Sequence, residues 1–195
     1  MPDLTDRARV LADAGIVLAK WGNEWFVFGA QAAIFWGRPR YTLDVDVTAR
    51  LEPEDSAGFC ADMERSGFRL KVQDREGFVA RTRVLPFIHV ATQMKLDVVL
   101  AGPGLEELFL QRSVQVDMDG VSIPIVSPED LVAMKILAGR AKDIEDVRAV
   151  LAARMKTLKI AQIRTTLGLL EQALAQSDLL RQFEAELSWV KKWVK

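Results

Sequence analysis

The sequence predicts an α+β protein in which a mixed β-sheet is flanked by helices and followed by a C-terminal helical bundle. Strand-like and helix-like segments alternate as far as about residue 126, and strand signals then stop. One acidic segment alternates polar and apolar residues with a period of two, as a strand with one buried face does. We therefore expect a sheet domain over residues 1–126 and a helical region packed on it over residues 127–195.

The first third of the chain predicts three helices and two strands. Proline fits the first turn of the third helix, acidic residues suit its positive end, and glycine closes it. A turn at Gly29 separates the first strand from the second helix. The expected segments are a helix over 4–20, a strand Trp25–Phe28, a helix Ala30–Trp36, a strand Leu43–Ala49 and a helix Pro53–Ser66.

The middle of the chain is richer in strands. Asp119-Gly120 between two apolar runs is a strong signal for a two-residue β-hairpin. Gly102-Pro103-Gly104 breaks the chain before a short helix. The expected segments are strands Phe68–Val72, Phe78–Val84 and Lys95–Leu100, a helix Leu105–Leu110, and strands Val114–Val116 and Val121–Val126.

The C-terminal region begins with a clear helix start. Ser127 suits the N-cap and Pro128 the first helical position. The last helix carries an apolar stripe at steps of three and four residues, and we favour the intramolecular core over a partner as its contact. The stripe consists of Leu180, Phe183, Leu187, Val190 and Val194.

Composition excludes several kinds of site. The 195 residues are 50% hydrophobic, and their net charge of −1 gives no sign of a strongly basic nucleic-acid-binding surface, although a local basic patch stays open. One cysteine and one histidine allow neither an internal disulfide nor a Cys/His zinc site. His89 lies in an apolar run, so a packed strand histidine is favoured over a catalytic one.

The N-terminal segment and the apolar runs predict a cytoplasmic protein without a membrane partner. Residues 1–20 have the pattern of an amphipathic helix rather than a secretory signal. The longest uncharged run, Trp25–Gly37, is too short to span a bilayer and contains glycines.

The acidic strand is the strongest indication of chemistry. With a period of two, Thr42, Asp44 and Asp46 share one face, while Leu43, Val45 and Val47 bury the other. Two carboxylates on one strand face repel each other unless a cation lies between them. The pattern therefore predicts a divalent metal site, although an exposed, solvated strand face is the alternative for an isolated pair.

A third carboxylate strengthens this prediction. Asp97 is the one acid within an apolar strand, and lone charges are rarely buried unless they are paired or bind a cation. On a neighbouring strand it could join Asp44 and Asp46 around one or two Mg²⁺ (or Mn²⁺) ions. Such a site neutralises phosphate charge, activates a hydroxyl and stabilises a pyrophosphate leaving group. Gly29 at a helix start would let backbone N–H groups approach a triphosphate, although neither a Walker nor a Rossmann motif is present.

The ordered set of motifs resembles the nucleotidyltransferase superfamily that includes DNA polymerase beta, and more closely the AbiEii-type enzymes. It runs from a strand and Gly29-Ala30 through a short helix to Arg40-Tyr-Thr42-Leu-Asp44-Val-Asp46, and then to a strand with a single Asp97. A later element runs from Lys135 through Arg140-Ala-Lys142-Asp143 to Asp146. The resemblance covers roughly residues 20–150.

The resemblance implies a nucleoside triphosphate substrate and a role for each matching residue. Asp44, Asp46 and Asp97 would bind the metal, with Asp97 also a candidate base. Gly29 and Ala30 would cradle phosphates, Arg40 would lie beside the metal strand, and Thr42 would brace the acidic pair. The cations Lys135, Arg140 and Lys142 would meet the triphosphate or acceptor, and Asp143 and Asp146 would hold those cations.

The resemblance leaves the acceptor and the activity open. The sequence does not name the acceptor, which can be RNA such as tRNA, protein or a small molecule. AbiEii-type enzymes are often toxins of toxin–antitoxin pairs, so an antitoxin is the partner that the resemblance implies. Ala30 replaces the second glycine or the serine of many members and supplies no hydroxyl, and whether Gln31 substitutes for that phosphate contact stays open. A catalytically inactive binding or regulatory module is therefore the alternative to a metal-dependent nucleotidyltransferase.

Overall fold

The computed structural model describes residues 4–193, so Val194 of the apolar stripe lies outside the described residues. The elements are α1 (Asp6–Lys20), β1 (Trp25–Phe28), α2 (Gly29–Trp36), β2 (Asp44–Ala49), η1 (Pro53–Asp55), α3 (Ser56–Arg65), β3 (Phe68–Leu70), α4 (Arg75–Thr82), β4 (Val84–His89), β5 (Lys95–Leu100), α5 (Leu105–Arg112), β6 (Val114–Met118), β7 (Val121–Ile125), α6 (Pro128–Ala138), α7 (Ala141–Arg154), α8 (Ile160–Leu174) and α9 (Leu179–Trp193).

The described residues divide into two compact units, and each is treated by itself. Unit 1 holds the described residues up to Gln31 together with Thr42–Val126. Unit 2 holds Ala32–Tyr41 and the described residues from Ser127 onward. The boundary at 126/127 coincides with the change from strands to helices, whereas residues 32–41 group with the helical unit rather than with the sheet.

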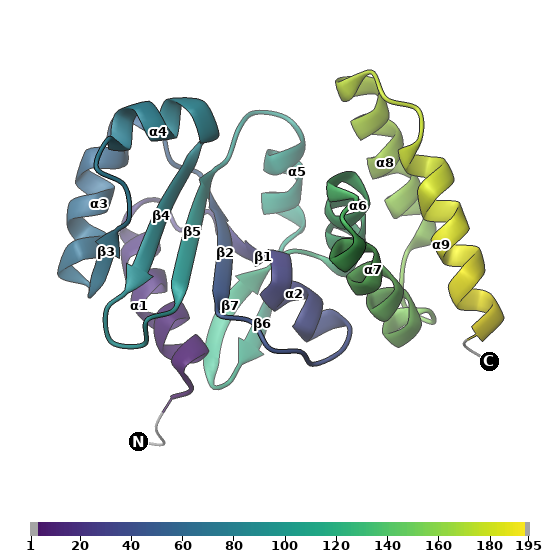
Figure 1. The fold of residues 1–195 in the computed structure, drawn as a ribbon, viewed down its shortest axis with the longest axis horizontal. Helices are drawn as coiled ribbons and strands as arrows, with labels where there is room; N and C mark the ends of the chain where they lie inside the picture. Colours follow the sequence, from purple (N-terminus) through teal and green to yellow (C-terminus); the bar gives the residue numbers. More distant parts are fainter. Residues whose placement is uncertain (1–3, 194–195) are drawn as a thin grey trace. The chain divides into compact units, whose positions relative to one another are not determined.

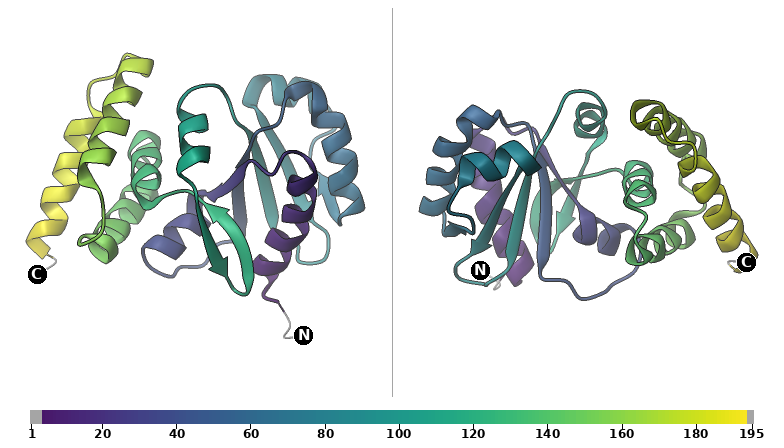
Figure 2. Two further views of the ribbon diagram at one scale, coloured as in Figure 1. Left: turned by 180° about the vertical axis from the view of Figure 1, so that it is seen from behind. Right: turned by 45° about the horizontal axis from the view of Figure 1, so that its top comes forward.

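Within residues 4–193 the strands form one seven-stranded mixed sheet in the order β3-β4-β5-β2-β1-β7-β6, all of it in unit 1 (Figure 1). The β2–β5 and β1–β7 pairs are parallel, and the other pairs are antiparallel. Helix α1 packs against β7 and α3, and Figure 2 shows it beside the β6–β7 hairpin. The predicted α+β sheet flanked by helices is confirmed.

The core of unit 1 follows the period-two pattern of its strands. In β2 and β5 every second side chain is almost fully buried: Val45, Val47, Leu96, Val98 and Leu100. The intervening carboxylates therefore lie on the other face of these two strands. The hairpin prediction is also confirmed, since Asp119 and Gly120 have φ values of 56° and 86°, as a type I′ turn requires.

Unit 2 is built from helices that contact one another, with α6 packing against α7, α8 and α9. Ser127 caps α6 by accepting a hydrogen bond from the Asp130 N–H, as predicted. Phe183, Leu187 and Val190 of the α9 stripe are at most 2% exposed, so the stripe faces the core of this unit. No helix among the described residues is both long enough and apolar enough to cross a membrane.

Two local predictions were wrong. The segment predicted as a strand over Phe78–Val84 is helix α4 as far as Thr82, because Asp74 caps it through the Gly77 N–H and Arg83 ends it in a left-handed conformation. Leu43 does not bury the apolar face of the acidic strand: it precedes β2 and is 48% exposed. The helix predicted from Pro53 begins as a 3₁₀ turn and becomes α-helical at Ser56.

Candidate functional site

The acidic face of β2 and β5 gathers the predicted metal-binding residues in unit 1. The two strands pair in parallel, with Asp44 opposite Lys95 and Asp46 opposite Asp97. Residues opposite each other in a sheet project to the same side. Asp46 and Asp97 are both half-buried, and Asp44 at the start of β2 is exposed.

The surroundings of Asp97 disfavour its charged form. Burial raises the pKa of the Asp97 carboxyl above its ordinary value, and the negative charge of Asp44 raises it further, while Lys71 and Lys95 act in the opposite direction. The strand pairing thus places acidic groups close enough to influence one another, as the sequence predicted.

Gly29 brings the backbone at the start of α2 against Asp46. Its φ is +63°, and a Cβ added to it would lie 2.0 Å from Asp46 Oδ2. Glycine is required here for two reasons, because an L side chain would be strained by the dihedral and would collide with the carboxylate. The next residue, Ala30, is half-buried in the first turn of α2.

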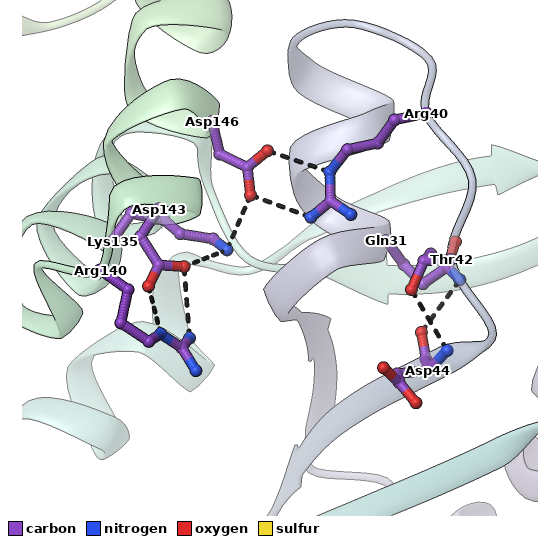
Figure 3. Close-up of polar contacts among 8 residues, drawn as sticks. All are labelled: Gln31, Arg40, Thr42, Asp44, Lys135, Arg140, Asp143 and Asp146. Carbon is purple, nitrogen blue, oxygen red and sulfur yellow. Dashed lines mark hydrogen bonds and ion pairs between the residues drawn. The ribbon is translucent and has the colours of Figure 1, made fainter.

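Both backbone polar groups of Asp44, its N–H and its carbonyl, are bound by side chains of unit 1. Gln31 Nε2 donates a hydrogen bond to the Asp44 carbonyl over 3.1 Å, and Thr42 Oγ1 accepts one from the Asp44 N–H over 3.2 Å (Figure 3). The Thr42 contact is the one that its predicted bracing role requires. The role of Gln31 was missed, since nothing in the sequence indicates where a buried helical amide points.

The oxygen donors on this face suit a magnesium or manganese ion. Among residues 4–193, no three His, Cys, Asp or Glu side chains form a ready-made metal cluster. Mg²⁺ is ordinarily held by one or two carboxylates together with substrate phosphates and water, rather than by a cage of protein ligands. Asp46 and Asp97 supply such a pair, since they stand opposite each other in the parallel register of β2 and β5.

Two lysines near the carboxylates were not singled out from the sequence. Lys95 Nζ lies 3.5 Å from Asp44 Oδ1, with both side chains more than half exposed. Lys71 lowers the pKa of Asp97. Lys95 could have been found, because it precedes Asp97 by two residues and therefore shares its strand face. Lys71 lies just beyond β3, and only the sheet order brings it near β5.

The single histidine and the single cysteine are both buried in unit 1. His89 is 2% exposed and its ring nitrogens contact Thr92 Oγ1 at 2.9 Å and Asp13 Oδ2 at 3.0 Å. Cys60 is 5% exposed, and burial raises the pKa of its thiol to about 11. A thiol with so high a pKa is a poor nucleophile at neutral pH.

Unit 2 contains a buried ionic network centred on Lys135. Lys135 Nζ lies 2.8 Å from Asp143 Oδ1 and 2.9 Å from Asp146 Oδ2 (Figure 3). The side chain of Lys135 is 8% exposed and that of Asp143 is fully buried. Burial would raise the pKa of Asp143, but hydrogen bonds from Arg140 and Lys135 hold it below its ordinary value.

The remaining predicted cations lie around this network. Arg40 donates two hydrogen bonds of 3.1 Å to the Asp146 carboxylate, and Arg140 donates to Asp143 across the start of α7. Asp143 and Asp146 therefore hold cations, as the resemblance implied. Within unit 2 the guanidinium of Arg40 is engaged by Asp146, and its expected place beside the strand of Asp44 and Asp46 stays a prediction. Lys142 is exposed in the first turn of α7.

Comparison with solved structures identifies the fold. The crystal structure of ANT(2'')-Ia in complex with adenylyl-2''-tobramycin matches with a TM-score of 0.58 at 14% identity, over 87% of this chain and 99% of that one. The solution structure of the same antibiotic-resistance factor gives 0.56 at 14% identity, over 87% and 94%. An antigenic nucleotidyltransferase-like protein from Paracoccidioides brasiliensis gives 0.55 at 16% identity, over 95% of each chain.

At these identities the likeness shows the fold alone, and that fold is the one found in nucleotidyltransferases. The chain matches no protein of curated function. The narrower resemblance to AbiEii-type enzymes stays a prediction. A family model does match residues 17–185, which is most of the chain, and the protein therefore belongs to the family described as "Nucleotidyltransferase of unknown function (DUF6036)".

Proposed function

We propose that the protein is a metal-dependent nucleotidyltransferase that transfers a nucleoside monophosphate from an NTP to an acceptor hydroxyl. The observation that carries the proposal is the register of Asp46 and Asp97 on parallel strands, beside a glycine that brings a helix start against Asp46. Membership of a nucleotidyltransferase family supports the reaction class.

Asp46 and Asp97, with Asp44 at the strand start, are the residues that would hold Mg²⁺ or Mn²⁺. A bound divalent cation would supply neutralisation of the triphosphate and of the developing pyrophosphate charge. Gly29 and Ala30 would offer backbone N–H groups to the phosphates at the start of α2. Thr42 would keep Asp44 in place through its backbone N–H.

In the proposed reaction the acceptor oxygen forms a bond to the α-phosphorus. The bond from that phosphorus to the bridging oxygen breaks, and pyrophosphate leaves with the electron pair. We assign the acceptor proton to Asp97, because its carboxylate lies in the middle of β5 opposite Asp46 and a positioned carboxylate can act as a general base.

The cations of unit 2 have different proposed roles according to their burial. Lys135 is buried between two carboxylates and would order the start of α7. Arg140 and Lys142 are exposed there, and we assign them to the triphosphate or the acceptor, because guanidinium and ammonium groups bind phosphate. Arg40, held by Asp146, would join them only if that ion pair opens.

The class of acceptor follows from analogy and is part of the proposal. The ANT(2'')-Ia structure holds adenylyl-2''-tobramycin, so one protein of this fold binds a small molecule that carries an adenylyl group. For this chain we expect RNA such as tRNA, or protein, from the resemblance to AbiEii-type enzymes. The same resemblance is the basis for expecting an antitoxin as a protein partner.

The test is transfer of label from an α-labelled NTP into cell lysate with Mg²⁺. Nuclease or protease treatment of the labelled product then identifies the acceptor as RNA or protein. The Asp44→Ala/Asp46→Ala double variant is the control, and its circular dichroism should match that of the wild type. Equal labelling by the wild type and the folded double variant would contradict the proposal.

A second candidate is a nucleotide-binding module without catalysis. Ala30 supplies no hydroxyl, and the Lys95 ammonium already lies beside Asp44. Calorimetry with Mg²⁺ and each NTP, followed by a pyrophosphate assay across acceptor pools, distinguishes the two. Binding without pyrophosphate release would favour the module. Growth arrest on expression that Asp44→Ala abolishes would instead favour an active toxin.

A further inference from the structure

The end of β1 leaves a gap in the sheet next to Asp44. Strand β1 pairs with β2 only as far as Phe28, which stands opposite Asp46. In an antiparallel ladder the residue facing Asp44 would be Ala30, but the chain has already turned into α2 at Gly29. Strand β2, which carries Asp44 and Asp46, therefore has no β1 residue paired with it at Asp44.

The side chain of Gln31 takes the place of the missing strand. It is 1% exposed and its Nε2 donates to the Asp44 carbonyl over 3.1 Å (Figure 3). On the other side of β2, the Leu43 carbonyl accepts from the Lys95 N–H over 3.1 Å. The start of β2 is thus held from β5 by backbone and from α2 by a side-chain amide.

The orientation of the Gln31 amide is fixed by a second contact. Its Oε1 accepts a hydrogen bond of 3.4 Å from Arg7 Nη1, and an amide rotated by 180° would place donors against that guanidinium. Arg7 is held in turn by Asp119 at the tip of the β6–β7 hairpin, at 2.6 Å from Nη2 and 3.1 Å from Nε. Asp119 also accepts from Thr5 Oγ1 at 2.8 Å.

We propose that Gln31 is a positioning residue for Asp44, which sets the place of the acidic pair by completing the ladder where β1 ends. The inference rests on the proposed function, because the position of Asp44 affects metal binding only if these carboxylates bind a metal ion. Gln31 therefore does not supply the phosphate contact that Ala30 lacks, because both ends of its amide are engaged within the protein. Its effect on the reaction is exerted through the Asp44 backbone.

The test compares Gln31→Met with Thr48→Val in the full chain. Methionine is close to glutamine in shape but neither donates to Asp44 nor accepts from Arg7. Thr48 is a buried polar residue on the same strand, 2% exposed and four residues beyond Asp44, so Thr48→Val controls for general loosening of β2. The measurements are Mn²⁺ affinity by electron paramagnetic resonance and amide hydrogen exchange at Asp44 by NMR.

For Gln31→Met we expect Mn²⁺ affinity to fall by about 10–100-fold, the usual effect of losing a group that orients a metal ligand. Exchange at the Asp44 amide, whose proton is bound by Thr42 Oγ1, should accelerate because the start of β2 opens more often without Gln31. Thr48→Val should leave both quantities near their wild-type values. Equal Mn²⁺ affinity and equal Asp44 exchange in the two variants would overturn the inference. Failure of the wild-type protein to bind Mn²⁺ would instead overturn the proposed function, and the Asp44 exchange rates would still decide whether Gln31 holds the strand.

Discussion

Asp46 and Asp97 stand opposite each other in register on the parallel strands β2 and β5. This pairing gathers two acids that are 51 residues apart in the sequence on one face of the sheet. The other face of the same strands is filled by buried valine and leucine, so neither acid can move to that side without burying its charge in the core. The fold therefore keeps both acids on the half-buried face of these two strands.

Asp97→Asn should separate stability from activity. Burial raises the pKa of this carboxyl, so its charged form costs folding free energy at neutral pH, and an amide of the same shape removes that cost. We expect a higher denaturant midpoint in the absence of metal and a loss of about 10²–10⁴-fold in transfer, typical of removing a general base. A midpoint below that of the wild type would show that Asp97 is a structural residue instead.

Gly29→Ala should weaken metal binding by more than its loss of stability explains. A left-handed conformation costs an L-residue roughly 1–2 kcal/mol, and the added methyl would also displace the Asp46 carboxylate. Gly22→Ala is the matched control, since Gly22 has φ +99° with no atom within 4 Å of an added Cβ. Urea unfolding should show a loss for both variants, larger for Gly29→Ala because of the collision with Asp46, whereas Mn²⁺ binding should fall only for Gly29→Ala. Equal metal binding by both would count against a functional role for Gly29.

Lys135→Met should destabilise the protein strongly. The variant leaves Asp143 and Asp146 without the ammonium that both contact. Breaking a buried ion pair by removing one partner costs about 3–5 kcal/mol. Lys142→Met, at an exposed position of α7, should change the free energy of unfolding by no more than about 0.5 kcal/mol. Similar unfolding curves for the two variants would show that the network contributes little.

The charge of Asp143 should make stability depend on acid pH. Burial opposes its ionisation, but Arg140 and Lys135 hold its pKa below the ordinary 3.8. A carboxylate with a lowered folded-state pKa stabilises the fold above about pH 4, and this contribution disappears as the pH falls through the folded-state pKa. Asp143→Asn should therefore be less stable than the wild type at pH 7, and the difference in urea midpoint should shrink below pH 4. A difference that is constant from pH 7 to pH 3 would contradict this account.

The strands that carry the acids were predictable because their pattern is local. Alternation in β2 and β5 follows from one buried face, and β5 was predicted from Lys95 to Leu100 as observed. The helical start at Ser127 and the hairpin at Asp119-Gly120 follow equally from short-range capping and turn chemistry. Where local signals are strong, the sequence was enough to predict the helices, strands and turns.

The features that depend on tertiary contacts were not predictable. The strand predicted over Phe78–Val84 is helix α4 because a short apolar run without a clear period fits either element, and the cap at Asp74 decides for the helix. The pairing of Arg40 with Asp146 joins residues 106 positions apart, and no pattern near Arg40 indicates it. Gln31 likewise required knowledge of where β1 stops relative to β2.

The most direct test of the central claim is the fate of each phosphate of one NTP. The purified protein would be incubated with Mg²⁺, an acceptor fraction and NTP labelled at either the α- or the γ-position, beside a folded Asp46→Asn variant. The account predicts that α-label becomes covalently attached to the acceptor, that γ-label is released as pyrophosphate, and that Asp46→Asn does neither. Transfer of γ-label to the acceptor, or undiminished transfer of α-label by Asp46→Asn, would contradict it.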